Sequence, residues 1–218
     1  MRMKRIAYIL LFSLLLVSCG TRSGYFKMEG RFLHMNQGEL YVYSPDGGIA
    51  GLDTIKIEAG RFSYEKPCSK PSTLIIIFPN YSTQPIFAES GEAVEVKADA
   101  SHLKEMEVEG TKDNELMTKF RKQIASVSPP EELKYAIAFI NDHPESAVSA
   151  YLLNRYLVQT ESPDYKQAAK LLPLLIKEQP DNTSLGRLQR HLSEFCSLPI
   201  GSKMPKFTAK DVNGKTVN

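Results

Sequence analysis

The spacing of apolar residues changes once along this 218-residue chain, and this change limits the folds open to it. Between Tyr25 and about Gly110, apolar and polar residues alternate, as in "YFKMEGRFL" and "RFSYE". Such alternation is typical of strands with one buried face. After Thr111 the apolar residues recur every three or four positions, which is the spacing of one helix face. The sequence therefore predicts an α+β chain, with a β-rich domain (25–110) followed by a helical connector domain (111–198).

The β-rich domain is expected to be an antiparallel β-sandwich or an open barrel. Short strand patterns such as "LYVY", "DTIKI" and "AVEVK" are separated by glycine-bearing turns at "PDGG", "EAG" and "ESG". The stretch "TLIIIF" (73–78) is apolar on both faces, which predicts a central strand. Pro85 has no N–H for a sheet ladder, so it predicts a strand start or an edge strand.

The helical domain is expected to be a bundle of about five helices. Ser128 is predicted to begin one helix, with Glu131 closing a capping box, and Ser162 repeats this Ser-Pro entry before a later helix. Pro173 predicts a kink or a break, since it removes a helix hydrogen bond. Two helix stripes support the assignment: Leu133, Ala136, Ile137 and Ile140, and Ala168, Leu171, Leu172 and Leu175.

A faint internal echo runs through the helical domain. "FINDHPES" and "LIKEQPDN" share a pattern, with Pro144 and Pro180 separated by 36 residues. Two interpretations stay open: a tetratricopeptide-like stacking of two helix-turn-helix units, and a plain antiparallel bundle. The echo lacks the defining small and aromatic positions of the repeat, which favours the plain bundle.

The first 18 residues are expected to be a secretory signal peptide. Arg2, Lys4 and Arg5 precede an apolar run (6–17) that is too short to span a bilayer. The run ends in "LVSCG", which resembles the bacterial lipobox, so Cys19 is the expected lipidation site and 19–24 the lipidated linker. The alternative is an ordinary signal peptide that contains a Cys. No Asp follows Cys19, so we expect a lipid anchor in the outer membrane that faces the periplasm.

The charge of the chain gives no sign of a nucleic-acid partner. The 27 Lys and Arg residues face 25 Asp and Glu residues, and loss of the signal peptide leaves a net charge of −1. Basic residues do not cluster with aromatic residues, as they do on nucleic-acid-binding surfaces. The apparent basicity of the chain therefore belongs to its signal peptide.

No catalytic, cofactor or metal site is expected from the residue pattern. The four histidines do not stand at ligand spacing from one another or from a Cys; they are His34, His102, His143 and His191. Three glutamates alternate with Met106 and Val108, which predicts the solvated face of a strand; they are Glu105, Glu107 and Glu109. Cys68 and Cys196 could pair in an oxidising compartment, although two small buried hydrophobes are the favoured interpretation.

Several stretches resemble the domain of unknown function 4369 family. They are "FKMEGRF", "DTIKIEAGRFSYE", "PIFAESGEAVEV" and "MEVEGTKDNELMTKF", between Tyr25 and Phe120. The resemblance implies a domain at the N-terminus of an envelope lipoprotein, followed by a helical connector and a thioredoxin-like thiol:disulfide oxidoreductase domain.

The last residues (199–218) resemble the start of such a thioredoxin-like domain. Its hairpin rhythm is matched by Gly201, Pro205, Phe207, Asp211 and Gly214, with a tight turn at Asn213-Gly214. The resemblance implies that the remainder of that domain, with its Cys-x-x-Cys motif, would lie beyond Asn218. The chain as given has no Cys-x-x-Cys and is therefore not expected to be an enzyme.

Two functions follow as expectations. The favoured one is a lipid-anchored, non-catalytic binding or spacer module of the cell envelope, with a possible envelope protein as partner. The alternative is the targeting and regulatory half of a thiol:disulfide oxidoreductase. A carbohydrate-binding role, testable at Tyr41 and Tyr43, has only analogy of fold behind it.

Overall fold

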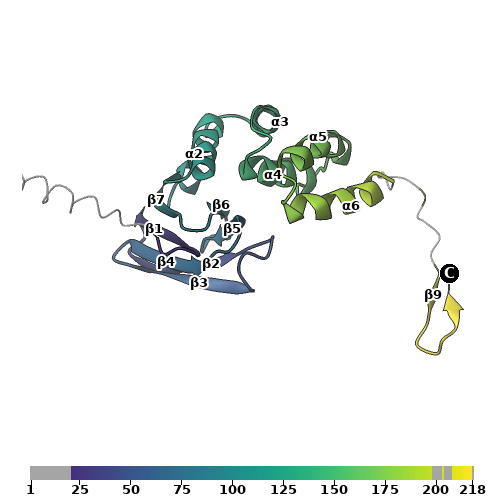
Figure 1. Cartoon of the computed structure of the whole chain (residues 1–218), viewed down its shortest axis with the longest axis horizontal. Coiled ribbons are helices and arrows are strands. Elements are labelled where there is room, and N and C mark those ends of the chain that lie inside the picture. Colours follow the sequence, from purple (N-terminus) through teal and green to yellow (C-terminus); the bar gives the residue numbers. More distant parts are fainter. Residues whose placement is uncertain (1–20, 198–202, 204–207, 218) are drawn as a thin grey trace, which may run out of the picture.

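The computed structural model describes residues 21–197, 203 and 208–217 (Figure 1). The signal peptide and Cys19 lie outside the described residues, as do Gly201, Pro205 and Phe207. The strands are β1 (Tyr25–Leu33), β2 (Gln37–Tyr43), β3 (Leu52–Glu58), β4 (Arg61–Pro67), β5 (Ser72–Ile77), β6 (Thr83–Ala88), β7 (Ala93–Asp99), β8 (Glu107–Glu109), β9 (Ala209–Lys210) and β10 (Thr216–Val217). The helices are η1 (Leu103–Glu105), α2 (Lys112–Ile124), α3 (Pro129–Asp142), α4 (Ala147–Leu153), η2 (Asn154–Val158), α5 (Tyr165–Glu178) and α6 (Thr183–Ser197).

Strands β1 to β8 form one sheet that curls into a nearly closed barrel. Their order is β6-β5-β2-β3-β4-β1-β7-β8, so β6 and β8 are the two edges. Neighbouring strands are antiparallel except β1 and β7, which run parallel. The expected open barrel is thus confirmed, with one parallel pair where an antiparallel sheet was predicted.

The predicted alternation describes the inside of the barrel. Phe26, Met28 and Phe32 of β1 are buried, and so are Phe62 and Tyr64 of β4. The ring of Phe32 lies 5.5 Å from that of Phe62. One apolar face per strand therefore fills a common core, as alternation requires.

The prediction of a central "TLIIIF" strand was wrong, because β5 is the second strand from an edge. Leu74 and Ile76 enter the barrel core, while Ile75 is buried on the opposite face. Ile75 pairs with Pro85 of β6, and Phe87, two residues along, packs in the helical core against Tyr151. The helices cover the outer face of β5 and β6, so both faces are apolar although the position is not central. Pro85 lies in edge strand β6, as predicted.

Five helices follow the barrel, as predicted, and the signal for one helix start holds in detail. The carboxylate of Glu131 accepts hydrogen bonds from the N–H of Ser128 at 3.2 Å and from its hydroxyl at 2.9 Å. Helix α5 runs unbroken past Pro173, so the prediction of a break at this residue was wrong. Pro173 lies on the exposed face of α5, where water can satisfy the freed carbonyl group.

The predicted helix start at Ser162 was also wrong. Helix α5 begins after Asp164, whose carboxylate accepts the N–H of Gln167 at 2.8 Å. An Asp side chain in this position is as good a cap as Ser. The Ser-Pro pair belongs to the turn before the helix.

Replacing Asp164 by alanine is expected to lower the free energy of unfolding by about 1 kcal/mol, the usual cost of a lost N-cap. Replacing the exposed Ser162 by alanine should change it by less than about 0.5 kcal/mol. Urea unfolding followed by circular dichroism measures both, since the chain has no tryptophan. Equal losses in the two variants would contradict the assigned cap.

Helix α2 closes the gap between the two edges of the barrel. Asn114 binds edge β6: its amide oxygen accepts the N–H of Phe87 at 3.0 Å, and its amide nitrogen donates to the carbonyl of Phe87 at 2.7 Å. Thr118 does the same on edge β8, where its hydroxyl accepts the N–H of Val108 at 2.8 Å and donates to the carbonyl at 2.9 Å. One buried helix face thus replaces the missing strand.

Strands β9 and β10 form a separate two-stranded hairpin near the C-terminus. Lys210 pairs with Thr216, and Ala209 with Val217. The carboxylate of Asp211 accepts the N–H of Asn213 at 2.9 Å, and Gly214 has a φ of 79°. The predicted hairpin is confirmed, but its loop is not the predicted two-residue Asn213-Gly214 turn. The N–H of Gly214 donates to the carbonyl of Asp211 at 2.9 Å, and only Gly214 of the two residues has a positive φ.

Candidate functional site

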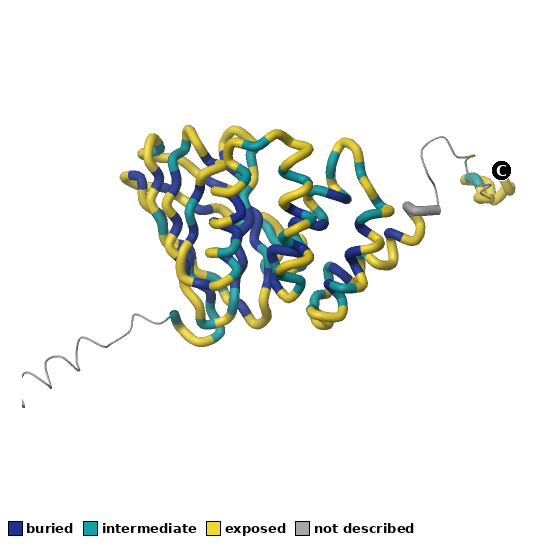
Figure 2. The backbone as a smooth tube through the Cα atoms, turned by 90° about the horizontal axis from the view of Figure 1, so that it is seen from above, coloured by how far each residue is buried: buried dark blue, intermediate teal, exposed yellow. Residues whose placement is uncertain are grey.

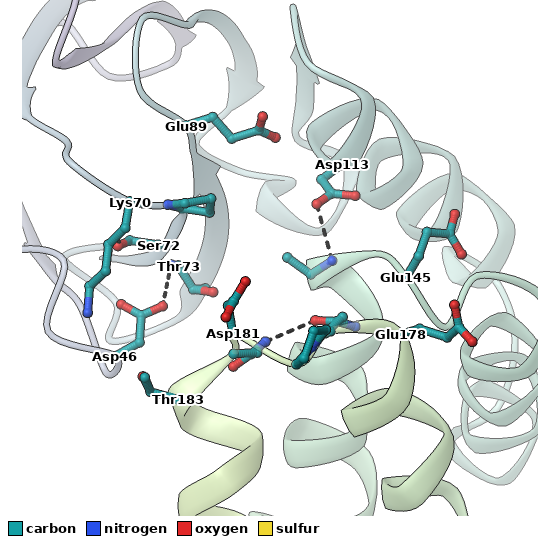
Figure 3. Close-up of a pocket in the computed structure, with 15 residues that line it drawn as sticks. Asp46, Lys70, Ser72, Thr73, Glu89, Asp113, Glu145, Glu178, Asp181 and Thr183 are labelled. Atoms are coloured by element: carbon teal, nitrogen blue, oxygen red, sulfur yellow. Dashed lines mark hydrogen bonds between the residues drawn. The ribbon is translucent and has the colours of Figure 1, made fainter.

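A cleft of about 490 Å³ lies where the barrel meets the turns of the helical domain (Figure 3). Barrel loops supply one wall, and the segments before α4 and around the α5–α6 turn supply the other. Its lining is Asp46, Lys70, Pro71, Ser72, Thr73, Glu89, Asp113, Glu145, Ala147, Glu178, Gln179, Pro180, Asp181, Asn182 and Thr183. Six of these side chains are carboxylates and one is a lysine.

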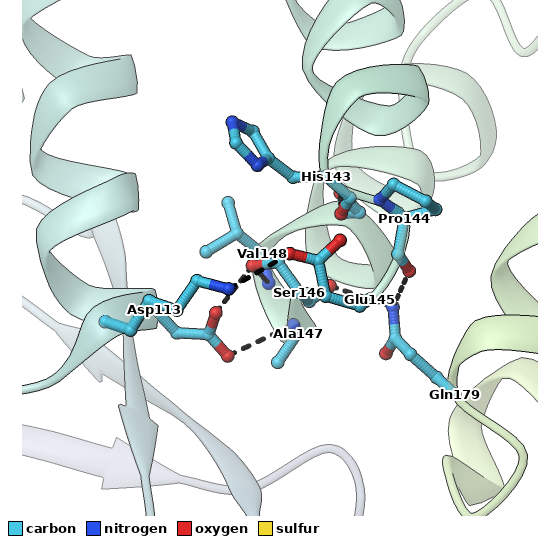
Figure 4. Close-up of polar contacts among 10 residues, drawn as sticks. Asp113, His143, Pro144, Glu145, Ser146, Ala147, Val148 and Gln179 are labelled. Carbon is cyan, nitrogen blue, oxygen red and sulfur yellow. Dashed lines mark hydrogen bonds and ion pairs between the residues drawn. The ribbon is translucent and has the colours of Figure 1, made fainter.

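The helical wall is built from two equivalent corners. His143 and Gln179 end α3 and α5 with nearly equal φ/ψ angles, −132°/55° and −130°/62°. Three residues later, Ser146 and Asn182 each accept the N–H two positions ahead, at 3.2 and 3.1 Å. The side-chain amide of Gln179 donates to the carbonyls of Pro144 and Ser146 at 2.7 and 2.8 Å (Figure 4). The 36-residue echo therefore marks two like corners in direct contact.

Asp113 ties helix α2 to the first corner. One carboxylate oxygen accepts the hydroxyl of Ser146 at 2.6 Å, and the other accepts the N–H of Ala147 at 3.1 Å (Figure 4). Ala147 is the first residue of α4, so the charge of Asp113 also faces the positive end of that helix. This carboxylate is fully engaged in holding the cleft together.

Asp46 holds the barrel wall in a similar way. Its carboxylate accepts the N–H of Thr73 at 2.7 Å and that of Gly48 at 3.3 Å, and it also accepts the hydroxyl of Ser44. The neighbouring carbonyl of Pro45 accepts a hydrogen bond from Arg187 of α6 at 3.1 Å. The loop that carries Asp46 is thereby fixed to both the sheet and the last helix.

The other four carboxylates of the cleft differ in how they are compensated. Glu145 lies 3.1 Å from Lys112, and Glu178 lies 3.1 Å from Lys177. Glu89 and Asp181 have no hydrogen-bond or ion-pair partner in the described part of the chain. Figure 3 shows Asp181 on the side of the cleft that holds Asp46 and Thr73. The arrangement favours cations over anions, and it offers carboxylates as hydrogen-bond acceptors.

Burial raises the pKa of Glu89, and the negative charges of Asp113 and Glu92 add to the effect. The folded state therefore binds this proton more tightly than the unfolded chain does. Protonated Glu89 favours folding at low pH, and that contribution is lost as the pH rises through the raised pKa.

The variant Glu89→Gln is accordingly expected to melt at a higher temperature than the unmodified protein at pH 7. At pH 4, below the ordinary Glu pKa, the two melting temperatures should agree. The exposed Glu39→Gln of β2 is the control and should change neither value. An equal gain at both pH values would show that charge at Glu89 is not the cause.

None of the cysteine and histidine side chains that the structure describes lines this cleft. Cys68 is buried in the barrel core, where its thiol donates to the carbonyl of Lys70 at 3.3 Å and burial raises its pKa. The side chain of Cys196 lies outside the described residues, as Cys19 does, so the favoured interpretation of Cys68 and Cys196 as two unpaired residues stays a prediction, with the disulfide as its alternative.

Two histidines from distant parts of the sequence meet at one carboxylate. The ring of His34 lies 2.9 Å from Asp99, and that of His102 lies 3.8 Å from the same side chain. His143 is the C-cap of α3, and His191 lies in α6. Within the described ranges, no group of three or more His, Cys, Asp or Glu side chains is placed to hold a metal ion.

Of the glutamates singled out by their alternation, Glu107 and Glu109 belong to strand β8, as predicted, whereas Glu105 ends the short helix η1 and is exposed there. Met106 and Val108 are fully buried, whereas Glu107 pairs with Lys122 at 2.7 Å. Tyr41 is 43% exposed on β2, outside the cleft.

None of the helices that the structure describes has both the length and the apolar character needed to cross a bilayer.

Residues 26–117 match one family model, described as Domain of unknown function (DUF4369). Neither the curated proteins nor the solved structures contain a match to the chain. The matched segment runs from β1 through the first part of α2 and includes Asn114, one of the residues that close the barrel. The β-rich part of the chain, together with the start of its closing helix, is therefore similar to the DUF4369 family of domains.

Proposed function

We propose that this protein is a lipid-anchored, non-catalytic module of the cell envelope that serves as a rigid spacer and docking body for a protein partner. The observation that carries the proposal is the junction made by α2. Buried side chains of this one helix hydrogen-bond to both edges of the barrel, and Asp113 of the same helix binds the start of α4. The barrel and the helical domain then move as a single body.

The course of the chain supports a spacer. The described chain enters at β1 of the barrel and leaves the helical domain at α6, at the opposite end of the body (Figure 2). A lipid on Cys19 would sit on the barrel side, so whatever follows or docks on the helices would stand off from the membrane. The stretch of basic and apolar residues before Cys19 is what motivates the lipid anchor and the envelope location.

Rigidity is tested by distance measurements across the junction. Spin labels attached through p-acetylphenylalanine at the exposed residues Glu39 of β2 and Lys170 of α5 should give one narrow distance distribution by double electron–electron resonance. A pair at Glu39 and the exposed Glu95 of β7, within the barrel, supplies the reference width. A distribution across the junction much broader than the reference would mean a hinge and would rule out a rigid spacer.

Anchoring is tested by replacing Cys19. Expressed in a Gram-negative host, the unmodified chain should fractionate with the outer membrane and incorporate labelled palmitate. The Cys19→Ala variant should carry no label. Loss of the label without release from the membrane would show that something other than a lipid holds the protein there.

A second candidate is the targeting and regulatory half of a thiol:disulfide oxidoreductase, and the hairpin of β9 and β10 favours it. Asp211 and Gly214 shape the turn of this hairpin, at the positions expected for the start of a thioredoxin-like domain. A reading frame that continues past codon 218 into a Cys-x-x-Cys motif would support this candidate. A stop codon at that position would favour the spacer.

A further inference from the structure

A second cavity, of about 340 Å³, lies at the other end of α2 from the acidic cleft. Its walls come from the loop before β6, from the last turns of α2, and from α4 with the π-helical segment η2. The lining residues are Tyr81, Ser82, Thr83, Gln84, Lys104, Met117, Arg121, Ile124, Ala125, Glu132, Tyr151, Arg155 and Tyr156. In contrast to the acidic cleft, three cationic side chains here face one carboxylate.

Arg121 brings a buried positive charge to this cavity. The residue is only 3% exposed. Its guanidinium donates to three neutral acceptors, the side-chain oxygen of Gln84 at 2.9 Å and the carbonyls of Pro85 and Met106 at 3.0 and 3.4 Å. These bonds use three of its five N–H groups. Burial lowers the pKa of Arg121 to about 10, so the side chain stays charged at neutral pH.

The hydrogen bonds of Arg121 go to neutral groups, so they do not balance its positive charge. The bonds to β6 and to Met106 help α2 to close the barrel, but neutral donors such as Asn114 do the same elsewhere on the helix. A buried cation is costly unless an anion balances it. No carboxylate pairs with Arg121 in the part of the chain that the structure describes. An anion from outside would supply the missing charge.

Tyr151 offers an unused hydroxyl in the same cavity. The ring is held by an edge contact with Phe87, with 6.3 Å between centroids. Burial raises the pKa of Tyr151. Tyr151 is half-buried, and its hydroxyl has no hydrogen-bond partner among the described residues. The hydroxyl is thus available as a donor to a bound oxygen.

Two unusual stretches of backbone line the cavity. Arg155 and Tyr156 lie on the π-helical segment Asn154–Val158, a geometry that is rare and often found at functional sites. Tyr81 adopts a φ of 63° and leaves its ring 87% exposed at the rim. Left-handed backbone at a residue other than glycine is strained, and such strain clusters at binding sites. Both stretches are independent of the charge of Arg121.

We propose that this cavity binds a small organic anion with a planar body. The oxyanion lies between Arg155 and the hydroxyl of Tyr151, in the field of Arg121, and the body packs on Met117 and the ring of Tyr81. The carboxylate of Glu132 accepts a hydrogen bond from the hydroxyl of Tyr156 at 3.1 Å. Because it is the one carboxylate among three cationic side chains, the net charge of the cavity lining is positive. Arginine suits both carboxylate and phosphate oxygens, so the shared chemistry is an oxyanion.

Four probes of one shape test the charge requirement by isothermal titration calorimetry on the whole protein: benzoate, phenyl phosphate, benzyl alcohol and benzamidine. We expect benzoate or phenyl phosphate to bind at least about tenfold more tightly than benzyl alcohol, the factor that one charge-assisted hydrogen bond supplies. Benzamidine should not bind. Whichever of the two anions binds more tightly identifies the oxyanion as carboxylate or phosphate.

Two variants test whether the anion binds in this cavity. Arg155→Ala, at an exposed residue whose loss should leave the fold intact, is expected to weaken anion binding about tenfold, and Tyr151→Phe should weaken it several-fold. Lys170→Ala removes an equally exposed cation from α5, away from the cavity, and should leave binding unchanged. The proposal is wrong if no anion binds saturably, if benzyl alcohol binds as well as benzoate, or if Arg155→Ala and Lys170→Ala behave alike.

Discussion

Replacing Asn114 by alanine is expected to lower the free energy of unfolding by about 3 kcal/mol. Asn114 is 1% exposed and satisfies both the N–H and the carbonyl of Phe87 on edge strand β6. Alanine would leave these two buried backbone groups without partners, at about 1–3 kcal/mol each. The higher helix propensity of alanine returns only about 0.7 kcal/mol of that loss.

Asn141 provides a matched control for this prediction. It also lies on a helix and donates to a backbone carbonyl, that of Ile137 at 2.8 Å, but it is exposed to water. Asn141→Ala should therefore change the free energy of unfolding by less than about 0.5 kcal/mol. Urea unfolding by circular dichroism compares the two variants. Similar midpoints for both would mean that α2 does not satisfy the open edge of the barrel.

The two periodicities predicted the fold class because each depends on local geometry. A strand places every second side chain on one face and a helix every third or fourth, whatever the partner element is. The burial of a strand's second face depends instead on which other elements pack against the sheet, and so it does not report the position of the strand within the sheet. Ile75 is buried on the face opposite the barrel core although β5 lies next to an edge strand, so two-sided burial alone could not distinguish a central β5 from one near the edge.

The helix starts show how a local signal can mislead. At Ser128 the Ser-Pro pair and the following Glu131 agree, and the helix begins there. At Ser162 the same pair is followed by Asp164, a second residue able to cap, and the helix begins after it instead. The energies of the two caps are close, so the sequence alone does not rank them.

The cleft was not predicted, because its residues come together only in the folded chain. Asp46 and Asp181 each follow a proline in a turn, and the repeated Pro-Asp pair was a usable signal for these two carboxylates. Nothing local places one turn opposite the other. Asn114, Thr118 and Arg121 carried a clearer signal, since polar residues at i, i+4 and i+7 share one helix face and this face turned out to be buried.

Gly30→Ala is the substitution within a strand from which we expect the largest loss, about 3 kcal/mol or more, or failure to fold. Gly30 lies in β1 between Phe62 of β4 and Val96 of β7. By alternation it faces the barrel interior, between Met28 and Phe32, where the ring of Phe62 fills the space a side chain would take. A Cβ atom at Gly30 would lie 2.5 Å from the carbonyl oxygen of Val96 and 2.6 Å from Cε1 of Phe62.

Neither neighbour of Gly30 can move without a loss elsewhere. The carbonyl of Val96 belongs to the sheet, and the Phe62 ring packs on Phe32. Overpacking of such a core costs about 1–3 kcal/mol and sometimes more. Gly38 of β2 is the control, because its nearest neighbour would be the sulfur of Met35 at 3.8 Å. Gly38→Ala should be neutral or slightly stabilising. If the two alanine variants unfold at the same urea concentration, the barrel interior is not packed as described.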